Sequence, residues 1–221
     1  MISKFFSYFL PINVYKKNSS ISKTLEVTWN NGELVLDSLN TNYSYGSLQR
    51  ILRKGLKYIG FERIKKFNNI LILGVAGGSV IKTLVDEIKY KGKITGVEID
   101  PNVITIANKY FHLDDIKNLE IHIDDAFEFV LKTKEKYDLI IIDIFQDTKM
   151  PNFLFEDFFI NRVNFLLNFE GFILFNTMVI NEKDRIRNLD YKKKFDENYS
   201  LRMYPKVEEH NELFTIKKLV K

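Results

Sequence analysis

Short, continuous apolar runs alternate along the chain with longer stretches in which apolar residues recur at helical spacing. Continuous runs are typical of strands buried on both faces, and the recurrence every three to four residues is typical of amphipathic helices. We predict strands at 70–73, 94–98, 119–123, 138–142 and 171–176, with helices near 79–90, 101–110, 125–133 and 153–168. Strands that alternate with helices predict an α/β fold with a parallel, doubly wound sheet.

The two ends of the chain follow other patterns. Residues 23–29 and 33–37 alternate in polarity on either side of Asn30-Asn31-Gly32, which predicts a β-hairpin, and apolar residues in 45–59 fall at helical spacing. Near the other end, 200–204 and 212–219 are extended runs joined by a short link, which predicts an antiparallel pair. We therefore expect an N-terminal β-hairpin module at 1–48 and an α/β domain at 49–221 with a mostly parallel seven-stranded sheet. This is the Rossmann-like layout of class I S-adenosylmethionine-dependent methyltransferases.

Composition limits the class of protein. The chain has 221 residues, 45% of them hydrophobic, which is enough for one substantial core and a small extra module. Its 33 basic and 29 acidic residues are interspersed, so Lys192–Lys194 is better explained as a solvated helix face than as a nucleic-acid surface. The chain has no cysteine, and its three histidines, His112, His122 and His210, show no paired spacing, so we expect no metal site. Residues 1–10 are too short for a membrane span, and we expect a cytoplasmic protein without a membrane partner.

A glycine-containing turn follows the first strand of the predicted sheet and opens a helix. Backbone N–H groups at such a turn point into the crevice where open α/β folds bind ligands. A dinucleotide fingerprint would place glycine at Ala76 and glycine or alanine at Ser79, and neither position holds glycine. The turn of methyltransferases fits better, so adenosylmethionine is favoured over NAD. The turn residues that we expect to contact the nucleoside are Gly74, Val75, Ala76, Gly77 and Gly78.

Carboxylates follow three consecutive strands at the same predicted edge. Glu98 is suited to accept both hydroxyls of a ribose, Asp125 to accept from an adenine amino group, and Asp143 to face the sulfonium and its substituents. Asp124, beside Asp125, is better explained as a helix cap. The predicted nucleoside site outside the glycine turn therefore consists of Glu98, Ile99, Asp125, Ala126 and Asp143.

From Leu34 to Leu219 the sequence resembles the spermidine synthase family. The resemblance lies in LVLDSLNTNYSYGSLQRIL, ILILGVAGGSV, GVEIDPNVITIANKYF, IDDAFEFV and YDLIIIDIF. It implies a nucleoside bound by Glu98, by Asp125 with Ala126, and by the glycine turn, with Asp143 as the acid closest to the chemistry. It also implies a homodimer and an N-terminal β-element, of which we expect little to remain in this sequence.

Three departures from the family pattern influence the expected reaction. The family's G-G-G-D-G-G turn has an acid where this chain has Gly77, its second strand-four acid is replaced by Gln146, and its Tyr-His-Glu string is replaced by Ser47-Leu48-Gln49. Because the missing groups recognise amines, we expect methyl transfer from S-adenosylmethionine to a small-molecule acceptor. Aminopropyl transfer from decarboxylated S-adenosylmethionine, and a non-catalytic nucleoside-binding relative, stay open as alternatives.

The acceptor side of the expected site lies between the N-terminal module and the first strand of the sheet. Asp143 is the expected base or acceptor anchor, with Tyr45 as a second catalytic candidate. Tyr43, Gln49 and Gln146 are candidates for acceptor binding, although a tyrosine at such a junction often serves only packing. Asn176 and Thr177, at the end of the fifth strand, are further candidates to face the pocket.

Overall fold

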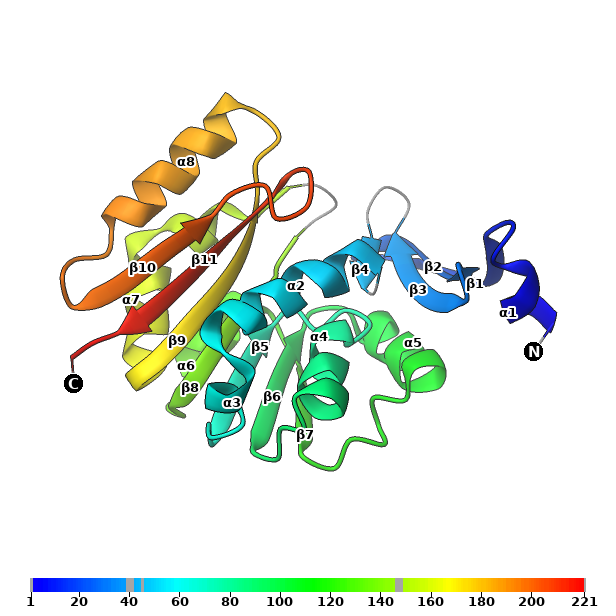
Figure 1. The fold of residues 1–221 in the computed structure, drawn as a ribbon, viewed down its shortest axis with the longest axis horizontal. Coiled ribbons are helices and arrows are strands. Elements are labelled where there is room, and N and C mark those ends of the chain that lie inside the picture. The colour runs from blue at the N-terminus through cyan, green and yellow to red at the C-terminus, as the bar shows by residue number, and fades with distance from the viewer. Residues whose placement is uncertain (1, 39–41, 45, 146–148, 221) are drawn as a thin grey trace.

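The computed structural model describes residues 2–38, 42–44, 46–145 and 149–220, which form two β-sheets and the helices that pack on them (Figure 1). The smaller sheet contains the strands β1 (Ile12–Ser19), β2 (Lys23–Asn30), β3 (Glu33–Ser38) and β4 (Asn42–Ser44). The larger sheet contains β5 (Asn69–Leu73), β6 (Lys93–Glu98), β7 (Leu119–Ile123), β8 (Tyr137–Ile142), β9 (Leu167–Met178), β10 (Tyr199–Tyr204) and β11 (Asn211–Lys218). The α-helices are α1 (Ile2–Phe6), α2 (Gly46–Ile59), α3 (Phe61–Ile64), α4 (Ser79–Lys82), α5 (Pro101–Phe111), α6 (Ala126–Lys132), α7 (Asp157–Leu166) and α8 (Glu182–Lys193).

The larger sheet has the strand order β10-β11-β9-β8-β5-β6-β7. Strands β7, β6, β5, β8 and β9 are parallel, and β11 pairs antiparallel with both β9 and β10. This arrangement confirms the predicted fold, a mostly parallel seven-stranded sheet finished by an antiparallel pair. The predicted helix at 153–168 is divided into a 3₁₀ turn at Asn152–Phe155 and α7, and a π-helical turn at Thr83–Glu87 continues α4.

Both faces of the larger sheet are covered, which explains the continuous apolar runs. In β5, Ile70 and Ile72 belong to one buried cluster, whereas Leu71 and Leu73 belong to the cluster on the opposite face. Helix α2 and the α4 segment contribute to the first cluster, and α6, α7 and α8 contribute to the second. Figure 1 shows α2 crossing one face of the sheet, close to the junction with the smaller sheet.

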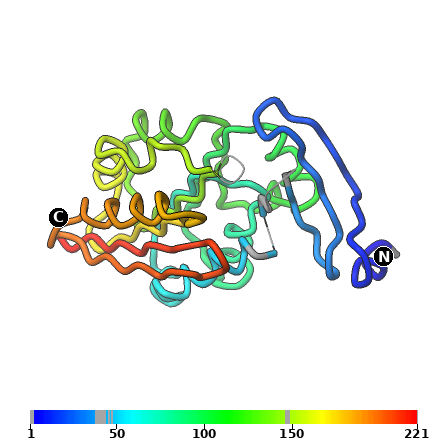
Figure 2. Tube along the Cα trace, turned by 90° about the horizontal axis from the view of Figure 1, so that it is seen from above, coloured from blue at the N-terminus to red at the C-terminus, as the bar shows by residue number. Residues whose placement is uncertain are grey.

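The N-terminal module is larger than the predicted hairpin. The hairpin is present as β2 and β3, and the turn residues Asn31 and Gly32 have φ values of 49° and 78°. Strands β1 and β4 extend it to four antiparallel strands, and most residues of β1 are exposed or half-buried, so its sequence lacks a buried apolar run. Figure 2 shows this sheet projecting from the end of the molecule opposite the one that holds α8 and β10.

Helix α5 lies between the two sheets. Ile104 and Ala107 belong to the buried cluster of the larger sheet, whereas another set of α5 residues packs against β2 and β3. The cluster with the smaller sheet contains Leu25, Val27, Leu36, Val103, Ile106 and Phe111. The N-terminal sheet is therefore attached to the helix that begins directly after β6.

A buried carboxylate joins the same two parts. Asp100 is 0% exposed, caps α5 by accepting from the Asn102 backbone N–H at 2.9 Å, and accepts from the Ser22 hydroxyl at 2.7 Å. The Ser19 hydroxyl also donates to Asp100, so both serines beside the β1–β2 turn bind this carboxylate. Burial favours its neutral form, but the hydrogen bonds from Ser19, Ser22 and Asn102 outweigh that effect and lower the pKa of Asp100.

We expect Asp100→Ala to lower the free energy of unfolding by about 2–4 kcal/mol. The change removes a helix N-cap, worth about 1 kcal/mol, and leaves the Ser19 and Ser22 hydroxyls without their buried acceptor, at about 1–3 kcal/mol. Urea denaturation measures the change, with the exposed Asp115→Ala as the control. A loss below about 0.5 kcal/mol would show that the hydrogen bonds of Asp100 with Ser19 and Ser22 add nothing to stability.

The described ranges contain neither a membrane-spanning helix nor a cluster of metal-ligating side chains. No helix there combines the length and apolar content needed to cross a bilayer. Within the same ranges, no group of three or more histidine, aspartate or glutamate side chains is arranged to hold a metal ion.

Candidate functional site

The glycine turn lies where β5 ends, against the end of β8. Gly74, Ala76 and Gly78 have positive φ values of 91°, 49° and 80°. A Cβ atom on Gly74 would lie 2.2 Å from the carbonyl oxygen of Asp143, so glycine is needed there for close backbone packing as well as for φ. The Asp143 N–H in turn donates to the Leu73 carbonyl at 2.9 Å. The turn and Asp143 are thus held together through their backbones.

Glu98 ends β6 directly beneath this turn and is only 7% exposed. One of its oxygens accepts from the N–H groups of Val75 at 3.2 Å and Ala76 at 3.0 Å, and the other accepts from the N–H of Asp100 at 3.1 Å. Burial raises the pKa of Glu98, and these three hydrogen bonds oppose the rise. Glu98 therefore fixes the conformation of the glycine turn, a role that is not visible in the sequence because it depends on how β6 packs beside the turn.

Asp143 follows β8 and is half-buried. Its Oδ1 accepts from Asn176 Nδ2, at the end of β9, at 2.8 Å. Burial raises the pKa of Asp143 to about 6; the hydrogen bond from Asn176 opposes the rise, and the charge of Glu98 adds to it. The group is consequently poised to change its protonation state near neutral pH, which suits a group that exchanges a proton with a substrate.

The edge between Glu98 and Asp143 is electrostatically negative. The charge of Glu98 raises the pKa of Asp143, and the charge of Asp100 raises the pKa of Glu98. A bound cation would relieve this repulsion, whereas a bound anion would increase it. The arrangement therefore favours ligands that carry positive charge.

The prediction that Asp124 caps the helix after β7 is wrong. Asp125, and not Asp124, caps α6: its Oδ1 accepts from the Phe127 backbone N–H at 2.7 Å. Asp124 Oδ1 accepts from the Asp125 N–H at 2.9 Å, and Ala126 is the first residue of α6. Ile99, 44% exposed, lies at the same edge after Glu98. The assignment of Ile99, Asp125 and Ala126 to the nucleoside stays a prediction.

The segment between the N-terminal sheet and α2 reaches the glycine turn. The buried Ser44 hydroxyl, at the end of β4, accepts from the N–H of Ser79, the first residue of α4, at 3.2 Å. This contact places β4, which contains Tyr43, beside the predicted nucleoside edge, and Gln49 is half-buried nearby on α2. Tyr45 and Gln146 lie outside the described residues. Ser44 was not identified from the sequence, because no local pattern links it to Ser79.

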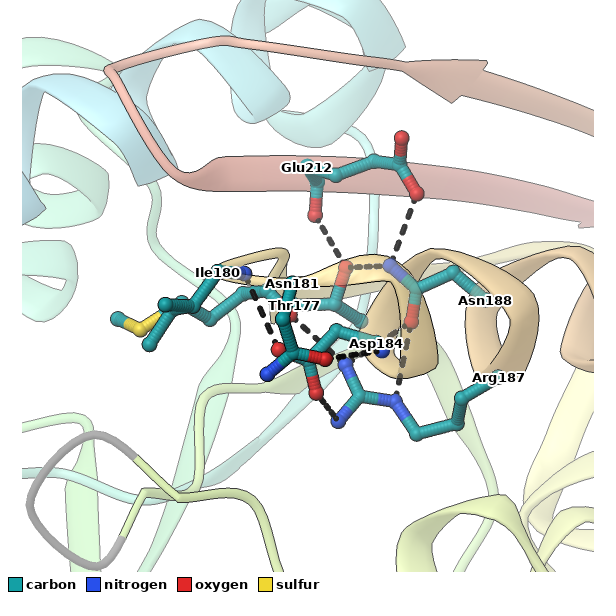
Figure 3. Close-up of polar contacts among 8 residues, drawn as sticks. Thr177, Ile180, Asn181, Asp184, Arg187, Asn188 and Glu212 are labelled. Carbon is teal, nitrogen blue, oxygen red and sulfur yellow. Dashed lines mark hydrogen bonds and ion pairs between the residues drawn. The ribbon is translucent and has the colours of Figure 1, made fainter.

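The two candidates at the end of β9 point to opposite faces of the sheet. Asn176 contacts Asp143, whereas Thr177 faces α8, donating to the Glu212 carbonyl at 2.8 Å and accepting from Asn188 Nδ2 at 2.8 Å. Figure 3 shows Thr177 within this polar network on α8, where the Asn188 amide also donates to the Glu212 carboxylate at 2.8 Å. The expectation that Thr177 faces the pocket is wrong, because neighbouring strand residues point to opposite faces.

Comparison with known proteins identifies related sequences. A family model described as the spermine/spermidine synthase domain matches residues 51–217. A polyamine aminopropyltransferase of Vibrio vulnificus (strain CMCP6) is 30% identical over 141 residues, which cover 62% of this chain and 47% of that protein. A polyamine aminopropyltransferase of Prochlorococcus marinus (strain MIT 9215) is 37% identical over 128 residues, covering 53% and 44% respectively. The match thus spans less than half the length of these relatives.

Comparison with solved structures supports the same fold. The crystal structure of a spermidine synthase from Thermotoga maritima superposes with a TM-score of 0.69 at 20% identity, over 94% of this chain and 72% of that chain. At this identity the likeness concerns the fold alone.

The expected preference for methyl transfer is wrong. The family model and the curated relatives point to aminopropyl transfer, which was the alternative. Two acids of the family pattern are missing, at Gly77 and Gln146, but Glu98 and Asp143 still place two carboxyl groups at this edge, and the charge of Glu98 acts on Asp143.

Proposed function

Because the chain belongs to the spermine/spermidine synthase family, we propose that it transfers an aminopropyl group from decarboxylated S-adenosylmethionine to an amine acceptor. The observation that carries this proposal is the Glu98–Asp143 edge, where negative charge lies beside the glycine turn. Both the donor, with its sulfonium and ammonium groups, and a polyamine acceptor are cations. The charge of the edge complements both substrates.

The proposed reaction is an in-line displacement at carbon. A neutral acceptor amine attacks the aminopropyl carbon next to sulfur, a C–N bond forms, and the C–S bond breaks with its electron pair left on sulfur, releasing methylthioadenosine. The attacking nitrogen then loses a proton. The sulfonium already activates the carbon, so the protein has to orient the amine and accept its proton.

Asp143 is suited to both tasks. Its carboxylate can hold an incoming ammonium by a charge-assisted hydrogen bond, and a pKa of about 6 leaves it mostly ionised at pH 7. We assign the ribose to Glu98, and the turn of Gly74–Gly78 to the rest of the nucleoside, where positive φ brings backbone close to the edge. Tyr43 and Gln49, on the N-terminal side, are assigned to the acceptor.

The test is an assay of both donors with a series of α,ω-diamines of increasing chain length. We expect methylthioadenosine and an aminopropylated amine from decarboxylated S-adenosylmethionine. Formation of S-adenosylhomocysteine from intact S-adenosylmethionine, without aminopropyl transfer, would contradict the proposal. Binding of methylthioadenosine without turnover of either donor would instead identify a non-catalytic relative.

Gly77→Asp is expected to shift the donor preference further toward decarboxylated S-adenosylmethionine, by roughly 10-fold. An acid there would offer the donor's terminal ammonium a partner and would repel the carboxylate of the intact donor, an effect of about 1–3 kcal/mol for a partly solvated pair. Gly77 is not among the residues with positive φ, so its backbone conformation is open to residues other than glycine. Calorimetric titration with both donors measures the preference.

The uncharged Gly77→Asn is the matched control for the Gly77→Asp titrations. If both variants change the two affinities equally, charge at this position does not select the donor. A homodimer and a cytoplasmic location remain predictions that accompany the proposed function.

A further inference from the structure

Asn176 and Asn211 form a chain of hydrogen bonds that ends at Asp143. Asn176 donates its amide N–H to Asp143 at 2.8 Å, and its Oδ1 accepts from Asn211 Nδ2 at 3.0 Å. Asn176 is 0% exposed, and Asn211 is half-buried. Both amide contacts of Asn176 thus use protein partners, one on each side of the same planar group.

We propose that Asn211 is a positioning residue that holds the Asn176 amide in the one orientation that donates to Asp143. An asparagine amide presents an acceptor on one side and a donor on the other. If the amide of Asn176 turned over, its oxygen would face the Asp143 carboxylate and its NH₂ would face the NH₂ of Asn211. Asn211 therefore makes the wrong orientation unfavourable at a second contact.

The backbone holds Asn211 at the required place. Its N–H donates to the Glu208 carbonyl at 2.7 Å, and its own carbonyl accepts from the Val207 N–H at 2.9 Å, which closes the turn before β11. Glu208 is in turn bound by α2, through ion pairs with Arg50 at 3.2 Å and Lys54 at 3.4 Å. The side-chain amide of Asn211 therefore lies on a turn that is held by its own backbone hydrogen bonds and by ion pairs to α2.

Strands β9 and β11, which contain Asn176 and Asn211, are also held together on the face that packs against α8. Thr177 and Glu212 are cross-strand partners on β9 and β11, and the Asn188 amide donates to both of them (Figure 3). Asn176 and Asn211 are the neighbours of these two residues and lie on the opposite face. The network on α8 therefore holds β9 against β11 without taking part in the amide contacts.

The groups acting on Asp143 in the described part of the chain are few. Glu98, from β6, acts through its charge, and Asn176, from β9, acts through its hydrogen bond. A change at Asn211 alters neither the charge of Glu98 nor the burial of Asp143 directly. Any effect of Asn211 on the titration of Asp143 must then pass through the orientation of Asn176.

The experiment is a carboxyl-carbon NMR titration of ligand-free protein labelled at aspartate, with the Asp143 signal assigned by its loss in Asp143→Asn. We expect Asn211→Leu to raise the pKa of Asp143 by about 0.5–1 from its value of about 6, because the carboxylate loses part of a donated hydrogen bond. Asn176→Leu should raise the pKa at least as much. Adding Asn211→Leu to Asn176→Leu should change it no further.

The matched control is Thr177→Val, which removes buried hydrogen bonds one residue from Asn176 but on the opposite face. It should lower the melting temperature and leave the pKa of Asp143 unchanged. The proposal is overturned if Asn211→Leu folds with an unchanged pKa, or if it shifts the pKa equally in the Asn176→Leu background. Asn211→Ala, which adds no bulk, replaces Asn211→Leu if that variant does not fold. Because no substrate is present, the result is independent of the proposed function.

Discussion

Asp143→Asn should lower kcat by roughly 10²–10⁴-fold while donor affinity changes little. The substitution keeps size and the hydrogen bond from Asn176 but removes the group that accepts the amine proton, and this loss is typical of a missing general base. In the unaltered protein, kcat/KM should fall about tenfold per pH unit below pH 6, where Asp143 becomes protonated. Steady-state kinetics over pH 5–9 and donor titration by calorimetry measure both effects.

The same variant should be more stable than the unaltered protein at pH 7. A pKa raised from 3.8 to about 6 means that the folded protein binds this proton more tightly than the unfolded chain, so ionised Asp143 costs folding free energy. Allowing for its partial exposure, we expect a gain of about 1–2 kcal/mol at pH 7, which should disappear as the pH falls toward 4. Full activity of Asp143→Asn, with or without that gain, would place the chemistry elsewhere.

Glu98→Ala should weaken methylthioadenosine binding by roughly 100-fold. Two charge-assisted hydrogen bonds to ribose hydroxyls are worth about 3 kcal/mol together. The structure adds a second cause, because the Val75 and Ala76 N–H groups lose their acceptor and the glycine turn loosens. Calorimetry on the folded variant measures the affinity.

Glu98→Gln separates these two causes. The amide oxygen can still accept from the turn, while the amide NH₂ then faces the Asp100 N–H. A loss confined to Glu98→Ala would indicate that the main role of Glu98 is to hold the turn. An equal loss in both variants, with the melting temperature of Glu98→Gln unchanged, would indicate that the ribose requires the charge. The exposed Glu120→Ala on β7 is the control, and binding within threefold of the unaltered protein in Glu98→Ala would refute the ribose assignment.

The larger sheet could be predicted because its signals are local. Ile70–Leu73 and Ile94–Val97 are continuous apolar runs, and each is followed by a turn or an acid at the same edge. The N-terminal sheet was predicted only where Asn31-Gly32 marks a turn. Strand β1 pairs along β2, and all but one of its residues are exposed or half-buried, so they form no buried apolar run.

The sequence predicted the acidic residues of the site but not the residues that form hydrogen bonds around them. Glu98 ends a strand and Asp143 follows one, and both positions are visible in the sequence. The hydrogen bonds Ser44–Ser79 and Asn176–Asn211, in contrast, each join residues 35 positions apart. Such contacts depend on how the elements pack. The cap was assigned to Asp124, which is wrong: either of two adjacent acids satisfies a capping pattern, and only the backbone geometry at the start of α6 selects Asp125.

The position of β11 between β9 and β10 has a consequence for the order of assembly during folding. β10 joins the sheet only through β11, although it precedes β11 in the chain. An intermediate in which β5–β9 have already paired would therefore keep an unpaired edge on β9, and its Asn176 would lack Asn211. The hydrogen-bonded environment of Asp143 is therefore complete only once β11 has paired with β9.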